Sequence, residues 1–326
     1  MNAFLHPLGA TLYVPATHAD LLAIANGDKL NHVRSLIFCT EDAVADRELS
    51  YALFNLSLAL QNMCPQSAAL RFVRVRNPEV MERILTLPGV EKLTGFVLPK
   101  ATHHNFDQYF RQIRQTPFKL MPTLETAEVF DDNEMKQFRH LLEAPGVRNH
   151  ILCLRIGGND LLALLGLRRP RHGTIYRTPL GPLIARLVTT FRPYGFALTA
   201  PVFEHLDNPA LLDQEVQEDL AHGMIGKTAI HPDQVAMIER HYQVGAHDIE
   251  VALKIVDDAS PAVFRMHESM CEVATLRGWA HGVIEQARVF GVHPLATATG
   301  ASHAANPANT PDEAKIGHNS VGPATN

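Results

Sequence analysis

Carboxylates follow several apolar segments of this 326-residue chain at the point where each segment ends. The run KLMPTLETAE (119–128) is apolar up to Leu124 and then presents Glu125, and HILCLRIGGND (150–160) ends in Asp160. Taken alone, Thr123 and the acids after it would also fit the first turn of a helix, where threonine caps and carboxylates interact favourably with the helix dipole. Because the pattern recurs along the chain, a shared site is the better interpretation.

Most of the other apolar segments also end in charged or polar residues. These are Glu41 with Asp42, Arg74 and Arg76, Lys100, Glu204, and Lys227 with His231. Each has an ordinary structural explanation when taken singly: Glu41 and Asp42 as helix caps, Lys100 as a loop lysine, His231 as a brace before a proline. Together they predict a cluster, provided that the segments are parallel strands whose ends meet at one face.

The residue types at these ends point to a magnesium site that binds an anionic substrate. Glu125 and Asp160 would lie on adjacent strands, and converging carboxylates suit a hard cation with oxygen ligands. The two glycines of GGND let the backbone approach a ligand closely. Either Arg74 or Arg76 could hold a substrate carboxylate by a bidentate contact, and both face the same way on an extended strand. The histidines, His103, His104 and His172 among them, show no zinc-ligand spacing, which predicts that there is no zinc site.

The elements that would position these residues form a repeating strand–helix pattern. Eight apolar or β-branched runs occur, at 10–16, 34–44, 70–78, 94–101, 119–128, 150–160, 196–204 and 223–232. Segments with helical spacing, such as 51–63 and 181–192, lie between most of them. Near-continuous apolar runs are typical of parallel strands covered by helices. Eight such units predict an α/β fold of the (β/α)8 TIM-barrel type. The alternative, a doubly wound open sheet, is disfavoured because no GxGxxG motif follows the first strand.

The pattern divides the chain into three parts. Residues 1–240 are predicted to form the barrel, and 241–296 a C-terminal helical extension that could pack on a neighbouring subunit. Residues 297–326 are small and polar, rich in Ala, Asn, Pro and Thr. They lack the apolar groups that would offset the entropy of ordering, so a disordered tail is expected there.

Composition excludes several classes of protein. Hydrophobic residues make up 46% of the chain and charged residues 19%, with a formal net charge of −5, which fits a soluble globular protein and not a nucleic-acid binder. Arg168, Arg169 and Arg171 cluster locally; they could bind a small anion, although a solvated loop is the more ordinary explanation. The four cysteines form no CxxC pair and indicate reduced thiols in a cytoplasmic protein. No signal peptide or membrane-spanning run is expected.

These motifs, in this order, resemble the citrate lyase β-subunit-like branch of the HpcH/HpaI aldolase family. The resemblance covers about residues 10–240 and rests on LYVPA (12–16), EDAV (41–44), RVRNP (74–78), LPKA (98–101), ETAE (125–128), GGNDLLALLG (157–166) and GKTAIHPDQ (226–234). It implies a metal-dependent barrel that makes or breaks carbon–carbon bonds next to a carboxylated carbonyl. The usual substrates of the family are acyl-CoA thioesters or small 2-oxo acids.

The resemblance also implies roles for individual residues. Glu125 and Asp160 become the Mg2+ ligands, and an arginine of RVRNP binds the oxo-acid carboxylate. Lys100 and Lys227 line the mouth, and Asp42 lies close to the arginine. Asp42 and Glu41 are the candidate catalytic residues. A homo-oligomer, a trimer or hexamer, is implied as well.

Some motifs depart from the family pattern. This chain has CTEDAV where the family usually has LEDAV, and RVRNP carries an extra arginine. IGGND replaces an FGTED-like sequence, and LTAPVFE replaces a small segment that often contains aspartate. TLYVPATHADLLAIANGDKL and LRIGGNDLLALLGLRR look closer to a side branch encoded with tellurite-resistance and stress genes.

The leading hypothesis is a Mg2+-dependent carbon–carbon lyase or aldolase acting on a 2-oxo acid or a hydroxy-acyl, including acyl-CoA, substrate. Its base is left open between a metal-bound water, Asp42 and a group from a neighbouring subunit. A Schiff base at Lys100 is disfavoured, because a bound metal already stabilises the developing charge. The competing hypotheses are a metal-dependent acyl-thioester hydrolase and a non-catalytic accessory subunit.

Overall fold

The computed structural model describes residues 8–293, and at its centre eight parallel strands form a closed ring. The strands are β1 (Gly9–Pro15), β2 (Ser35–Cys39), β3 (Leu70–Arg74), β4 (Gly95–Leu98), β5 (Lys119–Leu124), β6 (Leu154–Ile156), β7 (Leu198–Thr199) and β8 (Gly226–Ala229). Neighbours pair in chain order, β8 pairs with β1, and a bridge between Ala200 and Lys227 joins β7 to β8. The predicted (β/α)8 barrel is confirmed.

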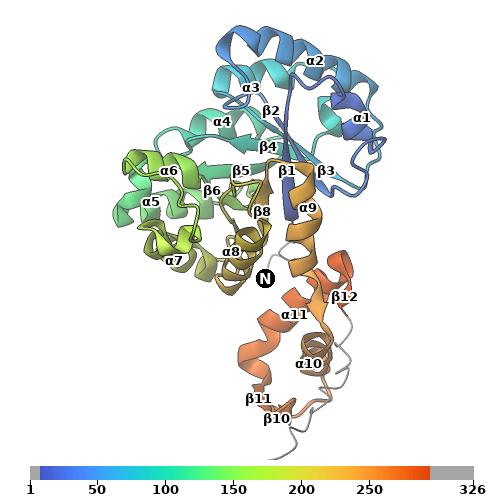
Figure 1. The fold of residues 1–326 in the computed structure, drawn as a ribbon, viewed down its shortest axis with the longest axis vertical. Coiled ribbons are helices and arrows are strands. Elements are labelled where there is room, and N and C mark those ends of the chain that lie inside the picture. The colour runs from blue at the N-terminus through green and yellow to red at the C-terminus, as the bar shows by residue number, and fades with distance from the viewer. Residues whose placement is uncertain (1–7, 294–326) are drawn as a thin grey trace, which may run out of the picture.

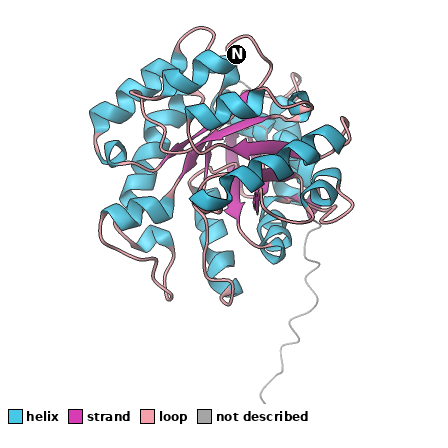
Figure 2. Cartoon of the chain, turned by 90° about the horizontal axis from the view of Figure 1, so that it is seen from above, coloured by secondary structure: helices cyan, strands magenta, loops and turns pink. Residues whose placement is uncertain are grey.

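Helices surround this ring on its outer side, as Figure 2 shows from above. They are α1 (Leu21–Asn26), α2 (Leu49–Asn62), α3 (Pro78–Leu85), α4 (Phe106–Ile113), α5 (Asp132–Glu143), α6 (Gly158–Leu164), α7 (Leu180–Phe191), α8 (Pro209–Ala221) and α9 (Pro232–Glu239). Three of them begin with a proline after a side-chain cap, from Asn77, Asn208 and His231. Such starts are favoured because proline lacks the N–H that the first helical residue leaves unpaired.

The inside of the barrel is a packed core near the N-terminal ends of the strands. One apolar side chain per strand fills it: Leu8, Ile37, Phe72, Val97, Met121, Cys153, Ala197 and Ile225. Side chains two positions further along a strand point the same way. Phe72, Met121 and Cys153 are therefore followed on the inner face by Arg74, Thr123 and Arg155. The apolar floor thus carries a polar layer at the carboxyl ends of the strands.

The C-terminal residues form a separate lobe beside the barrel (Figure 1). It contains β9 (Val244–Gly245), α10 (Ala246–Val256), β10 (Val263–Met266), β11 (Ser269–Glu272), α11 (Val273–Phe290) and β12 (Val292–His293). The two helices α10 and α11 fall within the range for which a helical extension is predicted, and a β-hairpin lies between them. Phe290 packs on Tyr242 and lies against Gly9, the first residue of β1. The lobe thus attaches at the face opposite the strand carboxyl ends; the expected tail, 297–326, lies outside the described residues.

Within residues 8–293, none of the helices has the length and apolar character needed to cross a membrane. All four cysteines are free thiols, as the sequence predicts, and only Cys64 is exposed.

Candidate active site at the carboxyl ends of the strands

Arg74, at the end of β3, lies at the centre of three carboxylates. Its Nη1 atom is 3.0 Å from Asp42 Oδ2, and its Nη2 atom is 2.9 Å from Glu41 Oε2 and 3.1 Å from Glu125 Oε1. The Lys100 Nζ atom lies 2.9 Å from the other oxygen of Glu41. The structure therefore brings together five of the residues that the sequence singled out, from four consecutive strands.

Glu125 directly follows β5 and is almost fully buried, with 4% of its surface exposed. Thr123 belongs to that strand and α5 begins only at Asp132, so the alternative of a helix cap at Thr123 is wrong. Burial raises the pKa of Glu125 to about 7; Arg74 opposes this effect, and the negative charge of Asp160 adds to it. Ionising this carboxylate is thus costly even with Arg74 beside it, and a further cation would reduce that cost.

Lys100 binds this carboxylate through its backbone. Its N–H donates to Glu125 Oε1 at 2.8 Å, and its carbonyl accepts a hydrogen bond from Asn105. The residue has a φ of +49°, which is unfavourable for a side chain larger than glycine and is maintained here by these contacts. Burial would lower the pKa of the Lys100 ammonium, but the hydrogen bond to Glu41 outweighs it and the pKa is raised. A protonated amine of this kind is a poor nucleophile for a Schiff base.

Glu41 and Asp42 differ in environment although they are adjacent. Burial raises the pKa of Glu41 in spite of Arg74 beside it. Burial acts in the same direction on Asp42, but its contacts with Glu41 and Arg74 prevail and lower its pKa. The Asp42 side chain is also 54% exposed, against 9% for Glu41. Asp42 is therefore the carboxylate of the pair that is ionised and accessible.

Asp160 lies in the first turn of α6 and faces the same cavity as Glu125. The cavity has a volume of about 340 Å³ and is lined by Tyr13, Asp42, Arg74, Glu125, Arg155 and Asp160, among others. Gly157, just before α6, has no side chain because a Cβ atom there would lie 2.4 Å from both the Cβ and the Oε2 of Glu125. The GGND motif thus makes room for the carboxylate.

These residues fit a magnesium ion. Glu125 and Asp160 supply oxygen atoms only, as Mg2+ prefers. Both hydrogen bonds to Glu125 are made to Oε1, while Oε2 lies on the side of Gly157 and α6. Burial and, to a smaller extent, the negative charge of Asp160 raise the pKa of Glu125, and a divalent cation between the two side chains would offset both effects.

Lys227 does not line this cavity, contrary to the prediction. In the pairing of β8 with β1, Lys227 lies opposite Ala10 and Thr228 opposite Thr11. Ala10 packs in the outer core, so Lys227 also points outward, and Thr228 takes the inward position. The Lys227 Nζ atom is fully buried, 2.9 Å from both Glu215 and Asp219 of α8.

Arg76 does not reach the cavity either, which separates it from Arg74. It lies beyond the end of β3, and its guanidinium donates to the carbonyls of Thr40, Glu41 and Val44 and to the Asp46 carboxylate. Arg76 therefore braces the loop that carries Glu41 and Asp42. Of the two arginines that spacing left open, the structure places Arg74 in the site.

Arg155 is a cavity residue that the sequence reasoning missed. It is 2% exposed, donates to Thr228 Oγ1 at 2.6 Å, and its guanidinium carbon lies 5.5 Å from the centre of the Tyr13 ring. The available signal was a charged residue between Leu154 and Ile156 inside an apolar run, since an isolated arginine in a buried strand must face a polar interior.

Two other strand-end residues take structural roles: Glu204 accepts a hydrogen bond from Asn159, and His231 caps α9.

We expect Gly157→Ala to lower the affinity for Mg2+ by about 10-fold or more, because the new methyl group must displace the Glu125 carboxylate. Isothermal titration calorimetry would measure this. Gly282→Ala is the matched control, since a Cβ atom at that position of α11 meets nothing within 4 Å. Unchanged affinity in Gly157→Ala would contradict a role for this glycine in positioning Glu125.

Comparison with known proteins agrees with this geometry. The family described as carbon–carbon bond lyases of the TIM-barrel fold matches residues 2–292. The human mitochondrial citramalyl-CoA lyase is 25% identical over 279 residues, which cover 81% of this chain and 78% of that protein. A citrate lyase subunit beta-like protein of Deinococcus radiodurans is 26% identical over 279 residues, 82% of this chain and 91% of that protein.

A solved structure shares the fold. The CitE protein of Mycobacterium tuberculosis, in complex with magnesium, acetoacetate and coenzyme A, superposes with a TM-score of 0.65 at 18% identity, over 86% of this chain and 98% of that one. The family match spans the barrel, the cavity and most of the C-terminal lobe. The resemblance to citrate lyase β-like proteins is thereby confirmed, whereas the narrower resemblance to the tellurite-resistance branch stays a prediction. The chain belongs to the carbon–carbon bond lyase family of TIM-barrel enzymes.

Proposed function

We propose that this lyase requires Mg2+, held by Glu125 and Asp160, and cleaves a carbon–carbon bond in a 2-oxo acid or hydroxy-acyl substrate. The observation that carries the proposal is the convergence of two acidic side chains and Arg74 in one cavity at the carboxyl ends of the strands. The magnesium in the complex of the mycobacterial CitE protein supports the choice of ion. When bound, the ion would supply a Lewis acid that polarises the chelating substrate oxygens.

Arg74 would anchor the substrate carboxylate. Its Nη1 atom contacts the half-exposed Asp42, a partner that can move aside, whereas its Nη2 atom is fixed by the buried Glu41 and Glu125. A guanidinium clamped on one side presents its remaining N–H groups in a fixed direction. Arg155 places a second positive charge in the same cavity and would favour an anionic substrate.

Asp42 is the best-placed base among the described residues. It is ionised, it borders the cavity, and it is next to the proposed anchor. In retro-aldol cleavage it would take the proton of the substrate hydroxyl while the carbon–carbon bond breaks. The hydroxyl-bearing fragment would leave as a new carbonyl compound. The electrons of the broken bond would stay on the other fragment as an enolate, which is protonated before release.

The extension suggests an assembly of several copies, and we propose a homo-oligomer. Large apolar side chains are exposed on this lobe, among them Leu253, Val263 and Met270. Light scattering on the purified chain would measure the mass of the assembly.

Product analysis by NMR tests the proposed reaction. Hydroxy-2-oxo acids and hydroxy-acyl-CoA thioesters would be incubated with the chain, with Mg2+ or with chelator. The proposal expects two carbon fragments to appear only with Mg2+. Release of coenzyme A together with an acid whose carbon chain is uncut would instead show a thioester hydrolase. Substrate binding without any product would show an accessory subunit.

A further inference from the structure

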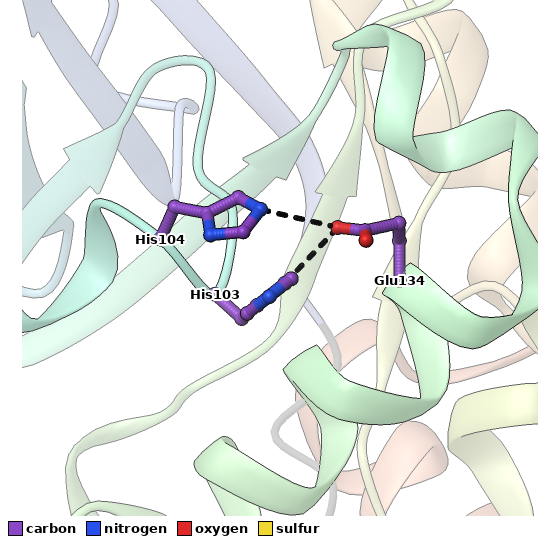
Figure 3. Close-up of side chains that lie close together, drawn as sticks. All are labelled: His103, His104 and Glu134. Atoms are coloured by element: carbon purple, nitrogen blue, oxygen red, sulfur yellow. Dashed lines mark ion pairs between the residues drawn. The ribbon is translucent and has the colours of Figure 1, made fainter.

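A second cluster of potential metal ligands lies outside the cavity, between the loop that follows β4 and the first turn of α5 (Figure 3). His103 Nδ1 is 3.2 Å and His104 Nε2 3.4 Å from Glu134 Oε2. All three atoms lie within 4.8 Å of one another, and the two imidazole rings are 3.8 Å apart between their centres. Two adjacent histidines are thus turned toward the same carboxylate oxygen.

That carboxylate oxygen is poorly satisfied by the protein. Oε2 of Glu134 is buried and, within residues 8–293, accepts no hydrogen bond. The two imidazole nitrogens are close to it, but neither meets hydrogen-bond geometry. A buried acceptor without a donor is destabilising. A cation between the three side chains would satisfy it.

The spacing of the three atoms fits a tetrahedral metal ion. Zinc binds histidine nitrogen at 2.0–2.1 Å and carboxylate oxygen at 2.0–2.2 Å, and the edge of a tetrahedron with such bonds is about 3.3 Å. The two nitrogen–oxygen separations, 3.2 and 3.4 Å, are close to this value before any adjustment. Imidazole ligands select zinc and the neighbouring transition metals over Mg2+.

We propose that His103, His104 and Glu134 bind a transition-metal ion of the Zn2+ type, with the remaining coordination position open to water. This site is chemically distinct from the all-oxygen pair of Glu125 and Asp160, and it stands independently of the proposed lyase function.

The position of the site suggests what a bound ion would do. His103 and His104 belong to the loop in which Lys100 binds Glu125 and Asn105 binds the carbonyl of Lys100. Glu134 belongs to the next helix, α5. A metal at this site would tie the loop to α5 and thereby hold Lys100 against Glu125. The prediction of no zinc site rested on spacing along the chain, which could not show that the next βα unit supplies the third ligand.

Zinc competition with a chromogenic chelator would test the site, using the full chain freed of metals and kept in excess Mg2+. We expect a zinc equivalent whose affinity falls about 100-fold or more in Glu134→Gln and in His103→Ala, since each removes one of three ligands. Glu125→Gln should keep this equivalent, which separates the site from the proposed Mg2+ site. Co2+ in place of zinc should give the strong visible absorption of a tetrahedral centre.

The chain offers a matched control in a second pair of stacked histidines. His247 and His267 have ring centres 4.1 Å apart, and His267 lies 2.9 Å from Glu250. Among the described residues, their ligand atoms do not form a converging group. His267→Ala should therefore leave zinc binding unchanged. The proposal is overturned if Glu134→Gln and His103→Ala bind zinc as tightly as the wild type, or if His267→Ala weakens binding as much as they do.

Discussion

Replacing Glu125 by glutamine should reduce the rate of Mg2+-dependent turnover by about 10³-fold. The same change should stabilise the metal-free protein at neutral pH. The loss of activity follows because glutamine lacks the charge that holds the cation, and metal polarisation of a carbonyl contributes several kcal/mol. The gain in stability follows from burial, which makes the ionised carboxylate unfavourable in the folded, metal-free state.

The pH dependence of this effect has a definite sign. The pKa of Glu125 is raised from 4.5 to about 7 in the folded protein. A carboxyl with a raised pKa binds its proton more tightly when folded, so its stabilising contribution is complete below about pH 4.5 and is lost as the pH rises through about 7. Glu125→Gln should therefore stabilise the metal-free protein by about 3 kcal/mol near pH 8 and by less than about 1 kcal/mol near pH 5.

Urea unfolding at these two pH values, with and without Mg2+, would measure the effect. Excess Mg2+ should stabilise the wild type and leave Glu125→Gln unchanged, because only the wild type binds the ion. Glu91→Gln, at an exposed position that precedes the N-terminal end of β4, serves as the control. A variant that is destabilised at pH 8 yet still stabilised by Mg2+ would contradict this assignment of Glu125.

Replacing Lys227 by methionine should reduce the free energy of unfolding by about 3–5 kcal/mol. Its Nζ atom is fully buried between Glu215 and Asp219, so the variant leaves two carboxylates with less compensating charge. Burial already raises the pKa of Asp219 to about 6 despite the lysine. The remaining partners, Arg169 on Glu215 and Tyr176 on Asp219, cannot replace a lost ammonium shared by both.

Urea unfolding would measure the free energy of unfolding of Lys227→Met, with Lys29→Met as the control variant. Lys29→Met, which removes only the exposed pair of Lys29 with Asp20, should leave the free energy of unfolding close to that of the wild type. Molecules of Lys227→Met that remain folded should bind Mg2+ as the wild type does. Normal stability combined with lost substrate binding would restore the original prediction that Lys227 lines the mouth.

The architecture could be predicted from the sequence because eight near-continuous apolar runs leave few alternatives. The strand-end residues Glu41, Asp42, Arg74, Lys100, Glu125 and Asp160 could be predicted for the same reason, since strand ends of a barrel share one face. Whether a strand side chain points into or out of the barrel was harder to predict, because this depends on the residue at which the strand begins. Lys227 faces outward only because the pairing with β1 puts Thr228 inside.

Other features depend on contacts that no local pattern encodes. Arg76 resembles Arg74 in spacing, but it lies past the end of β3, where the chain is free to turn it toward the 40–46 loop. Arg155 belongs to the inner face, yet its partner Thr228 is 73 residues away. His103 and Glu134 come from consecutive βα units, so their proximity appears only in the folded chain.

Calorimetry on the wild type, Glu125→Gln and Asp160→Asn tests the central claim most directly, with Mg2+ titrated first and a 2-oxo acid such as pyruvate, glyoxylate or oxaloacetate second. We predict that the wild type binds Mg2+, that the oxo acid binds only when Mg2+ is present, and that both folded variants lose both binding events. Binding of an oxo acid to the wild type without Mg2+, or Mg2+ binding that survives in both variants, would contradict it.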